Sequence, residues 1–102
     1  MAILIRSTEE KKITISGTDI ELQEVYGRIR FLGDFNGKSI QGEVATFANI
    51  ATFEEEKILY TDVPTGPYQS QLEVGEVQSL ETAHKYAKIA YEQLGYEVII
   101  KM

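Results

Sequence analysis

Hydrophobic and polar residues alternate along two neighbouring segments, 25–34 and 38–47, which flank Asn36-Gly37. Asn-Gly readily adopts positive φ at both centres of a type I′ turn, whose twist suits a β-hairpin. If the chain turns there, the numbers of opposing residues sum to 73, and Arg30 faces Glu43. One apolar face then forms from Val25, Ile29, Phe31, Gly33, Ile40, Gly42 and Val44. The pattern predicts a central antiparallel hairpin, because a one-residue slip would mix the two faces.

A second apolar pattern, with the period of an α-helix, lies near the C-terminus. Ser79 suits the N-cap of this helix and Gly95 suits the position just after its end. The residues that recur at helical spacing form one stripe: Leu80, Ala83, Ala87, Ala90, Tyr91 and Leu94. We therefore predict an amphipathic helix over about 80–94, lying close to a sheet because its stripe is rich in alanine. A final strand is expected at 96–101, where consecutive apolar residues suggest burial on both sides.

Weaker signals predict the remaining elements. Two short strands at 2–6 and 11–16, a helical segment at 50–56 capped by Asn49, and strands at 57–61 and 68–77 complete the pattern. The whole chain of 102 residues is expected to form one domain of the α+β class. Its sheet is expected to be mainly antiparallel, and segments 2–6 and 97–101 are the candidate edge strands.

Composition narrows the class of protein. The chain is 43% hydrophobic and 25% charged, which is typical of a globular domain. It has no cysteine, so disulfides and thiolate sites are excluded. No apolar run is long enough to cross a bilayer, and the first residues do not fit a signal peptide. We therefore expect synthesis and folding in the cytoplasm of the host cell. The net charge of −6 disfavours nucleic acid and anionic membranes as partners.

The residues that could carry catalysis have simpler explanations. Segment 33–39 resembles a phosphate-binding loop, but it has three residues between its glycines instead of four, and a strand follows. His84 is the only histidine and is expected at the boundary of the core. Glu54-Glu55-Glu56 would fan outward rather than converge on a cation. We predict no catalytic, metal or cofactor site and no small-molecule substrate, with an enzyme on an unfamiliar site left as an alternative.

The most suggestive feature is the set of six tyrosines in a chain without tryptophan. Tyrosine serves both core packing and protein–protein contact, because its ring buries area while its hydroxyl stays polar. Tyr60 and Tyr68 flank a turn that contains Pro64 and Pro67. These four residues are the predicted protein-contact site, and the other tyrosines are expected to pack inside the domain.

Several short stretches of the central hairpin region resemble one class of proteins. The stretches are Val25–Arg30, Asn36–Ile40, Thr46–Ala48 and Phe53. Their arrangement resembles small virion-associated structural proteins of tailed bacteriophages and prophages. The resemblance implies a multi-copy, homo-oligomeric part of a neck, tail or capsid surface, with itself and other virion proteins as partners. A small intracellular protein-binding or adaptor domain remains the alternative.

Overall fold

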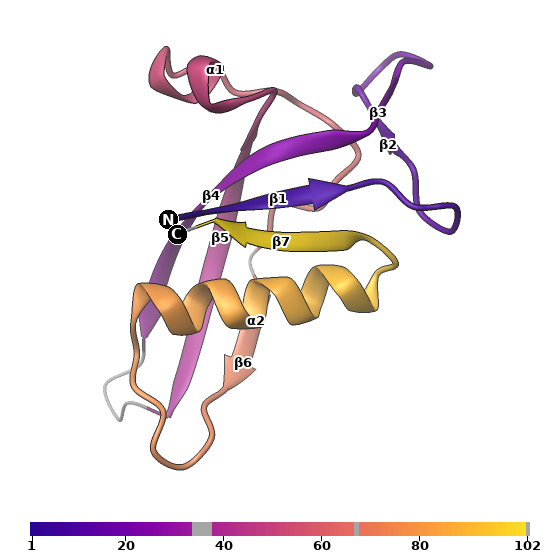
Figure 1. Cartoon of the computed structure of the whole chain (residues 1–102). Helices are drawn as coiled ribbons and strands as arrows, with labels where there is room; N and C mark the ends of the chain where they lie inside the picture. Colours follow the sequence, from indigo (N-terminus) through magenta and orange to yellow (C-terminus); the bar gives the residue numbers. More distant parts are fainter. Residues whose placement is uncertain (34–37, 67, 102) are drawn as a thin grey trace.

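The computed structural model describes residues 1–33, 38–66 and 68–101. The chain has an α+β fold with a mostly antiparallel sheet, as predicted (Figure 1). Its elements are β1 (Ala2–Arg6), β2 (Ile13–Thr14), β3 (Glu21–Leu22), β4 (Glu24–Gly33), β5 (Ser39–Phe47), α1 (Ile50–Glu54), β6 (Tyr68–Gln71), α2 (Leu80–Gln93) and β7 (Glu97–Lys101). Five strands form one sheet in the order β6-β5-β4-β1-β7, and β2 pairs with β3.

The central hairpin has the register that the sequence predicts. Each residue pair between β4 and β5 sums to 73, with Ile29 opposite Val44 and Arg30 opposite Glu43. Arg30 Nη2 lies 2.7 Å from the Glu43 carboxylate, and this exposed pair contributes about 0.2–1 kcal/mol. The predicted turn at Asn36-Gly37 lies outside the described residues. Because successive residues of a strand point to opposite faces, this register gives the hairpin one apolar face and one face that carries the charged residues.

Helix α2 covers the apolar face of the sheet and closes the core (Figure 1). The Ser79 hydroxyl accepts a hydrogen bond of 3.2 Å from the Thr82 amide, and Gly95 adopts a φ of 104°. Both ends of the helix thus follow the predicted capping residues. The main core joins α2 to the strands: Ile3, Ile5, Ile13, Val25, Val44, Val63, Ala87, Tyr91, Tyr96 and Val98.

The buried side of α2 differs from the predicted apolar stripe. Leu80 and Leu94 are 41% and 49% exposed, because they stand at the two ends of the helix. His84 and Tyr86 are buried instead. The expectation that His84 lies at the boundary of the core is wrong, since its exposed fraction is 0%. Its Nδ1 lies 2.7 Å from the Leu80 carbonyl oxygen, a contact within the helix that satisfies one of the two ring nitrogens.

Segments that connect the main elements are less regular than predicted. The prediction of a strand at 57–61 is wrong. The backbone of this segment forms hydrogen bonds with two different parts of the chain: the Leu59 amide donates to the Thr46 carbonyl oxygen, whereas the Tyr60 carbonyl oxygen accepts from the Ser16 amide. A single bridge, from Ile15 to Thr61, remains there. The strand expected at 68–77 ends at Gln71, and the strand at 11–16 shrinks to Ile13–Thr14.

The short helix α1 begins as predicted and ends earlier. The Asn49 side chain accepts a 3.0 Å hydrogen bond from the Thr52 amide, and the Thr52 hydroxyl accepts one from the Asn49 amide. This reciprocal pair is a capping box. The helix stops at Glu54, two residues before the predicted end, and Glu56 turns the chain with a φ of 59°.

The two candidate edge strands occupy different places. β1 pairs with both β4 and β7, so the prediction that it is an edge is wrong. β7 pairs with β1 alone among the described strands, as expected for an edge. The predicted burial of β7 on both sides is also wrong, since Val98 is buried but Ile99 and Ile100 are only half-buried. The other end of the sheet is β6.

Candidate functional site

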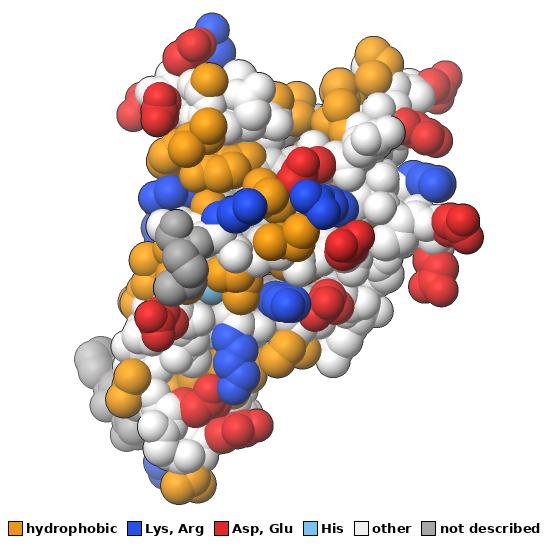
Figure 2. Space-filling model, viewed as in Figure 1, with side chains coloured by type: hydrophobic (Ala, Val, Ile, Leu, Met, Phe, Trp, Pro, Cys, Tyr) orange, Lys and Arg blue, Asp and Glu red, His pale blue; other side chains and the backbone are white. Residues whose placement is uncertain are grey.

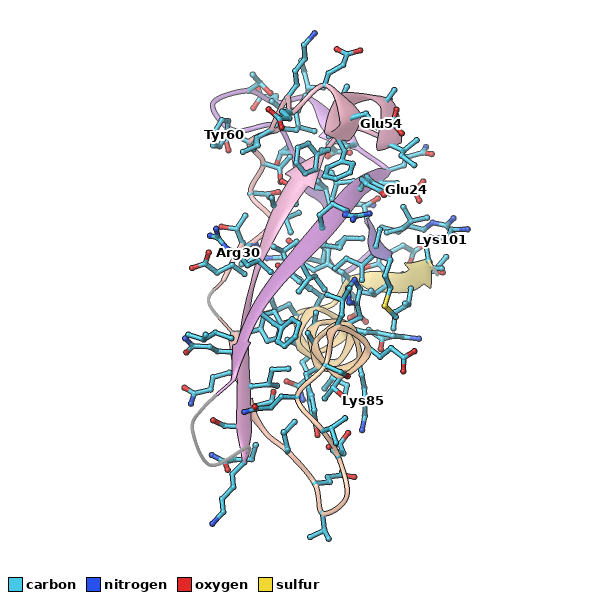
Figure 3. The ribbon with its side chains drawn as sticks, turned by 90° about the vertical axis from the view of Figure 1, so that its left-hand side faces the viewer. Glu24, Arg30, Glu54, Tyr60, Lys85 and Lys101 are labelled. Atoms are coloured by element: carbon cyan, nitrogen blue, oxygen red, sulfur yellow. The ribbon has the colours of Figure 1, made fainter. Side chains whose placement is uncertain are left out.

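The side of the sheet opposite α2 carries only partial cover, and we call it the open face. Its residues alternate in the strands with those that face α2: Leu4 of β1, Tyr26, Arg28, Arg30 and Leu32 of β4, Glu43, Ala45 and Phe47 of β5, and Ile99 of β7. Figure 3 shows Arg30 pointing away from α2, whereas Lys85 projects from the helix on the other side. Leu32 is 64% exposed on this face. Its exposed apolar residues make the open face a candidate contact surface.

An aromatic cluster fixes α1 at one end of the open face. The Phe53 ring centroid lies 5.8 Å from that of Tyr26 and 5.1 Å from that of Phe47. The Arg28 guanidinium lies 4.5 Å from the centre of the Phe53 ring, and its Nη1 donates a 3.3 Å hydrogen bond to the Tyr26 hydroxyl. The stacked cation covers the ring and holds α1 over the sheet.

Two hollows flank this cluster. The first, of about 580 Å³, lies between α1 and the ends of β1 and β7, where Glu24 and Lys101 stand below Glu54 (Figure 3). The second, of about 390 Å³, lies between β5 and segment 58–65. Both are shallow surface features and not enclosed cavities. Sites that bury most of a small ligand are usually deeper.

The structure divides the predicted contact residues between different surroundings. Tyr60 is 71% exposed and lines the second hollow, as does Pro64. The Pro64 carbonyl accepts a hydrogen bond from the Tyr91 hydroxyl, which ties this turn to α2. Pro67 lies outside the described residues. Tyr60 and Pro64 are therefore brought together with Ile58, which is 51% exposed and which the sequence reading did not single out.

Tyr68 also packs within the fold. Its ring lies over Gly42 of the neighbouring strand, and its hydroxyl donates a 2.7 Å hydrogen bond to the Ala83 carbonyl oxygen of α2. Burial raises the pKa of Tyr68 to about 12, because the phenolate form would be poorly solvated there. Tyr68 joins β6 to α2, and its hydroxyl is already used within the fold.

A cluster of charged side chains lies at the start of β7. The Arg6 guanidinium lies 3.5 Å from a Glu24 carboxylate oxygen and 3.9 Å from one of Glu97. All three side chains are more than a third exposed, so these pairs contribute little to stability. At the other end of the strand, Lys101 makes no ion pair with any residue that the structure describes. The sequence pattern predicts β7 as an edge, but the prediction did not include this separation of charge along the strand.

The carboxylate with the most perturbed pKa belongs to a loop contact. Glu76 accepts hydrogen bonds from the Lys85 ammonium at 2.7 Å, from the Tyr86 hydroxyl and from the Glu73 amide. These donors, with Lys85 the largest contributor, lower the pKa of Glu76 to about 2. Glu76 thereby fastens the loop after β6 to α2. It lines neither hollow.

Among residues 1–33, 38–66 and 68–101, no three histidine or acidic side chains come together as a metal site would require. The helices in these ranges are too short or too polar to span a membrane. No protein-family model, no curated protein and no solved structure matches this chain.

Leu32 and Ala45 are the residues from which the sequence could have indicated the apolar part of the open face. Given the register of the hairpin, both fall among the charged residues of the face opposite α2. Both are apolar side chains at positions whose neighbours on this face include Arg28, Arg30 and Glu43.

Proposed function

We propose that this chain is a non-enzymatic structural protein that acts by assembling with copies of itself. The observation that carries the proposal is the five-stranded sheet with outer edges at β6 and β7 that no other described strand covers. An open edge presents a row of backbone amides and carbonyls to which another strand adds readily. The resemblance to small virion-associated proteins extends the proposal to a multi-copy part of a phage neck, tail or capsid surface. Synthesis would then take place in the cytoplasm of the host.

Contacts within the fold explain the shifted pKa values of this protein better than a catalytic role does. The groups with raised or lowered pKa, such as Tyr68 and Glu76, are engaged in contacts between α2 and neighbouring segments. Apolar side chains line the first hollow together with Glu24, Arg28 and Lys101, and the second hollow is lined by apolar side chains and threonines. Such surfaces are typical of interfaces, which combine an apolar centre with a polar rim.

Size-exclusion chromatography with multi-angle light scattering tests the proposal directly. We expect a molar mass that is a multiple of 11.5 kDa and that rises with protein concentration. A mass of one chain from micromolar to millimolar concentration would contradict self-assembly. Sedimentation velocity on the same samples distinguishes a defined oligomer from nonspecific aggregation.

A second candidate function, an adaptor domain, is favoured by the hollow at Ile58, Tyr60 and Pro64. Exposed tyrosine and isoleucine side chains beside a proline turn are typical of a contact that a partner protein covers. In affinity capture from host extract, a partner at this hollow would be lost with Tyr60→Ala. The same partner should be retained by Ile20→Ala, which removes an exposed apolar side chain elsewhere.

A further inference from the structure

We infer that two copies of this chain pair through β7, antiparallel and centred on Ile99. This inference rests on the proposed function and specifies the interface that self-assembly would use. β7 pairs with β1 on its inner side, and no other described strand pairs with its outer side (Figure 1). Two such edges joined about a twofold axis would continue the sheet from one copy into the next.

The sequence of β7, Glu-Val-Ile-Ile-Lys, is complementary to itself when reversed. With Ile99 opposite Ile99 of the second copy, Glu97 faces Lys101 and Val98 faces Ile100. The same pairs recur on the other side of the axis because the interface is symmetric. Opposite charges directly across an antiparallel pair stabilise it, and like charges destabilise it.

Other registers lack this complementarity. Centring the pair on Val98 places Glu97 opposite Ile99, and centring it on Ile100 places Lys101 opposite Ile99. Each of these moves a charge onto an apolar neighbour and leaves the opposite charge without a partner. A shift of one residue would place Glu97, which lies on the open face, opposite a residue that faces α2. The Ile99 register alone satisfies both charges and both apolar pairs.

The β7 side chains have the exposure and the available charges that such a pairing requires. Ile99 on the open face and Ile100 on the α2 face are half-buried, so a second strand would cover apolar surface on both sides of the sheet. The Glu97 side chain is 58% exposed, with the Arg6 guanidinium no closer than 3.9 Å. Lys101 has no ion-pair partner among the described residues. Figure 2 shows hydrophobic side chains between basic and acidic ones over β1 and β7.

Charged residues on an edge strand often prevent pairing, and here they are placed to select a partner. Edge-protecting charges work by their position opposite apolar groups of an approaching strand. In β7 they stand only at the two ends, four positions apart in the sequence, where each meets its opposite in a second copy. The twofold axis lies perpendicular to the sheet, so both copies of α2 would lie on the same side of the joined sheet.

A single cysteine at the axis tests the register. The chain has no cysteine, so Ile99→Cys introduces the only thiol. Directly opposed antiparallel residues have Cα atoms about 4.5–5.5 Å apart, a separation that a disulfide spans. We expect rapid disulfide-linked dimers of Ile99→Cys under mild oxidation. Ile20→Cys, at an exposed position outside the five-stranded sheet, is the matched control and should cross-link no faster than random collision.

A charge swap tests the same interface without a covalent bond. Glu97→Lys and Lys101→Glu each place like charges at two symmetric positions, and each should raise the dimer dissociation constant about 5–30-fold. The double variant Glu97→Lys/Lys101→Glu restores opposite charges and should return to within roughly threefold of the original value. Circular dichroism and urea unfolding of each variant establish that folding is retained, because Glu97→Lys also affects Arg6.

The outcomes separate this inference from the proposed function. An oligomer that forms normally in all charge variants, with no preferential cross-linking at position 99, overturns pairing through β7 and leaves self-assembly standing. A chain that stays monomeric at every concentration overturns both. Failure of the double variant to recover the affinity, while it remains folded, also overturns the register.

Discussion

Gly42→Ala tests how β6 is held against α2. A Cβ atom at Gly42 would lie 2.5 Å from Cζ and 2.8 Å from Cε1 of Tyr68. Side chains of real proteins essentially never approach so closely, so one of the two groups must move. The Tyr68 ring has little freedom, because its hydroxyl is bonded to the Ala83 carbonyl oxygen at 2.7 Å.

The loss in the free energy of unfolding of Gly42→Ala depends on which of two movements relieves the clash. If the Tyr68 ring swings outward, the fold loses a hydrogen bond worth about 1 kcal/mol and roughly another 1 kcal/mol of ring burial. If the strands shift instead, overpacking costs about 1–3 kcal/mol. The better strand propensity of alanine relative to glycine returns about 0.5 kcal/mol. We expect a net loss of about 2 kcal/mol in the free energy of unfolding.

Urea unfolding followed by circular dichroism measures this loss. With a slope of about 1–3 kcal/mol per molar urea, the midpoint should fall by roughly 1 M. The neighbouring Gln41→Ala is the control, because Gln41 is exposed on the opposite face of the same strand. If the ring swings out, the pKa of Tyr68 also falls from about 12 toward its ordinary value of 10.

A double-mutant cycle decides whether Tyr68 is the cause. In a Tyr68→Ala background the ring is absent, so Gly42→Ala should be neutral or slightly stabilising. A loss of about 2 kcal/mol that persists in that background would refute the explanation. An unchanged midpoint for Gly42→Ala alone would refute it as well.

Three further predictions concern acid stability and a helix cap. Because the pKa of Glu76 is about 2 in the fold against an ordinary 4.5, its stabilisation is present above pH 4.5 and is lost as pH falls from there; Glu76→Gln should abolish this part of the urea-midpoint profile. Burial lowers the pKa of His84 below 6.5, so the unfolded chain binds the proton first and stability falls as pH drops below 6.5; His84→Leu should flatten that step, and an unchanged profile would contradict it. Asn49→Ala removes the capping box and should weaken α1 by about 0.5–2 kcal/mol, measured as faster amide exchange at Phe53. Equal exchange in both proteins would show that α1 is held by Phe53 packing alone.

Local signals made the hairpin and α2 predictable. Alternation with a period of two admits one register for β4 and β5, because a slip would reverse the faces of every residue. The Arg30–Glu43 pair supports the same register. The ends of α2 follow from Ser79 and Gly95, which act within one turn of the helix. Each of these features depends on residues that are close in sequence.

The remaining features depend on distant parts of the chain. The apolar stripe of α2 passes beside His84, and only the rotation of the helix on the sheet decides that this ring is buried. Tyr68 was predicted as a contact residue because nothing in its own segment reveals the space above Gly42. That space exists only once β6 pairs with β5, which places the two residues opposite each other. Tertiary placement thus adds a packing role for Tyr68 that no local signal reveals.

The order of strands separates two segments that look alike in the sequence. β1 (Ala-Ile-Leu-Ile-Arg) and β7 (Glu-Val-Ile-Ile-Lys) have the same length and similar apolar centres, and both were candidate edges. Paired with itself about its centre, β1 would set Ala2 opposite Arg6 and leave that charge without a partner. β6, with the sequence Tyr-Gln-Ser-Gln, has no charge to define a register. Among the described strands, β7 alone combines an open edge, an apolar centre and opposite charges at its ends. The strand that is best suited to bind its own copy is therefore also the strand that the fold leaves at the edge.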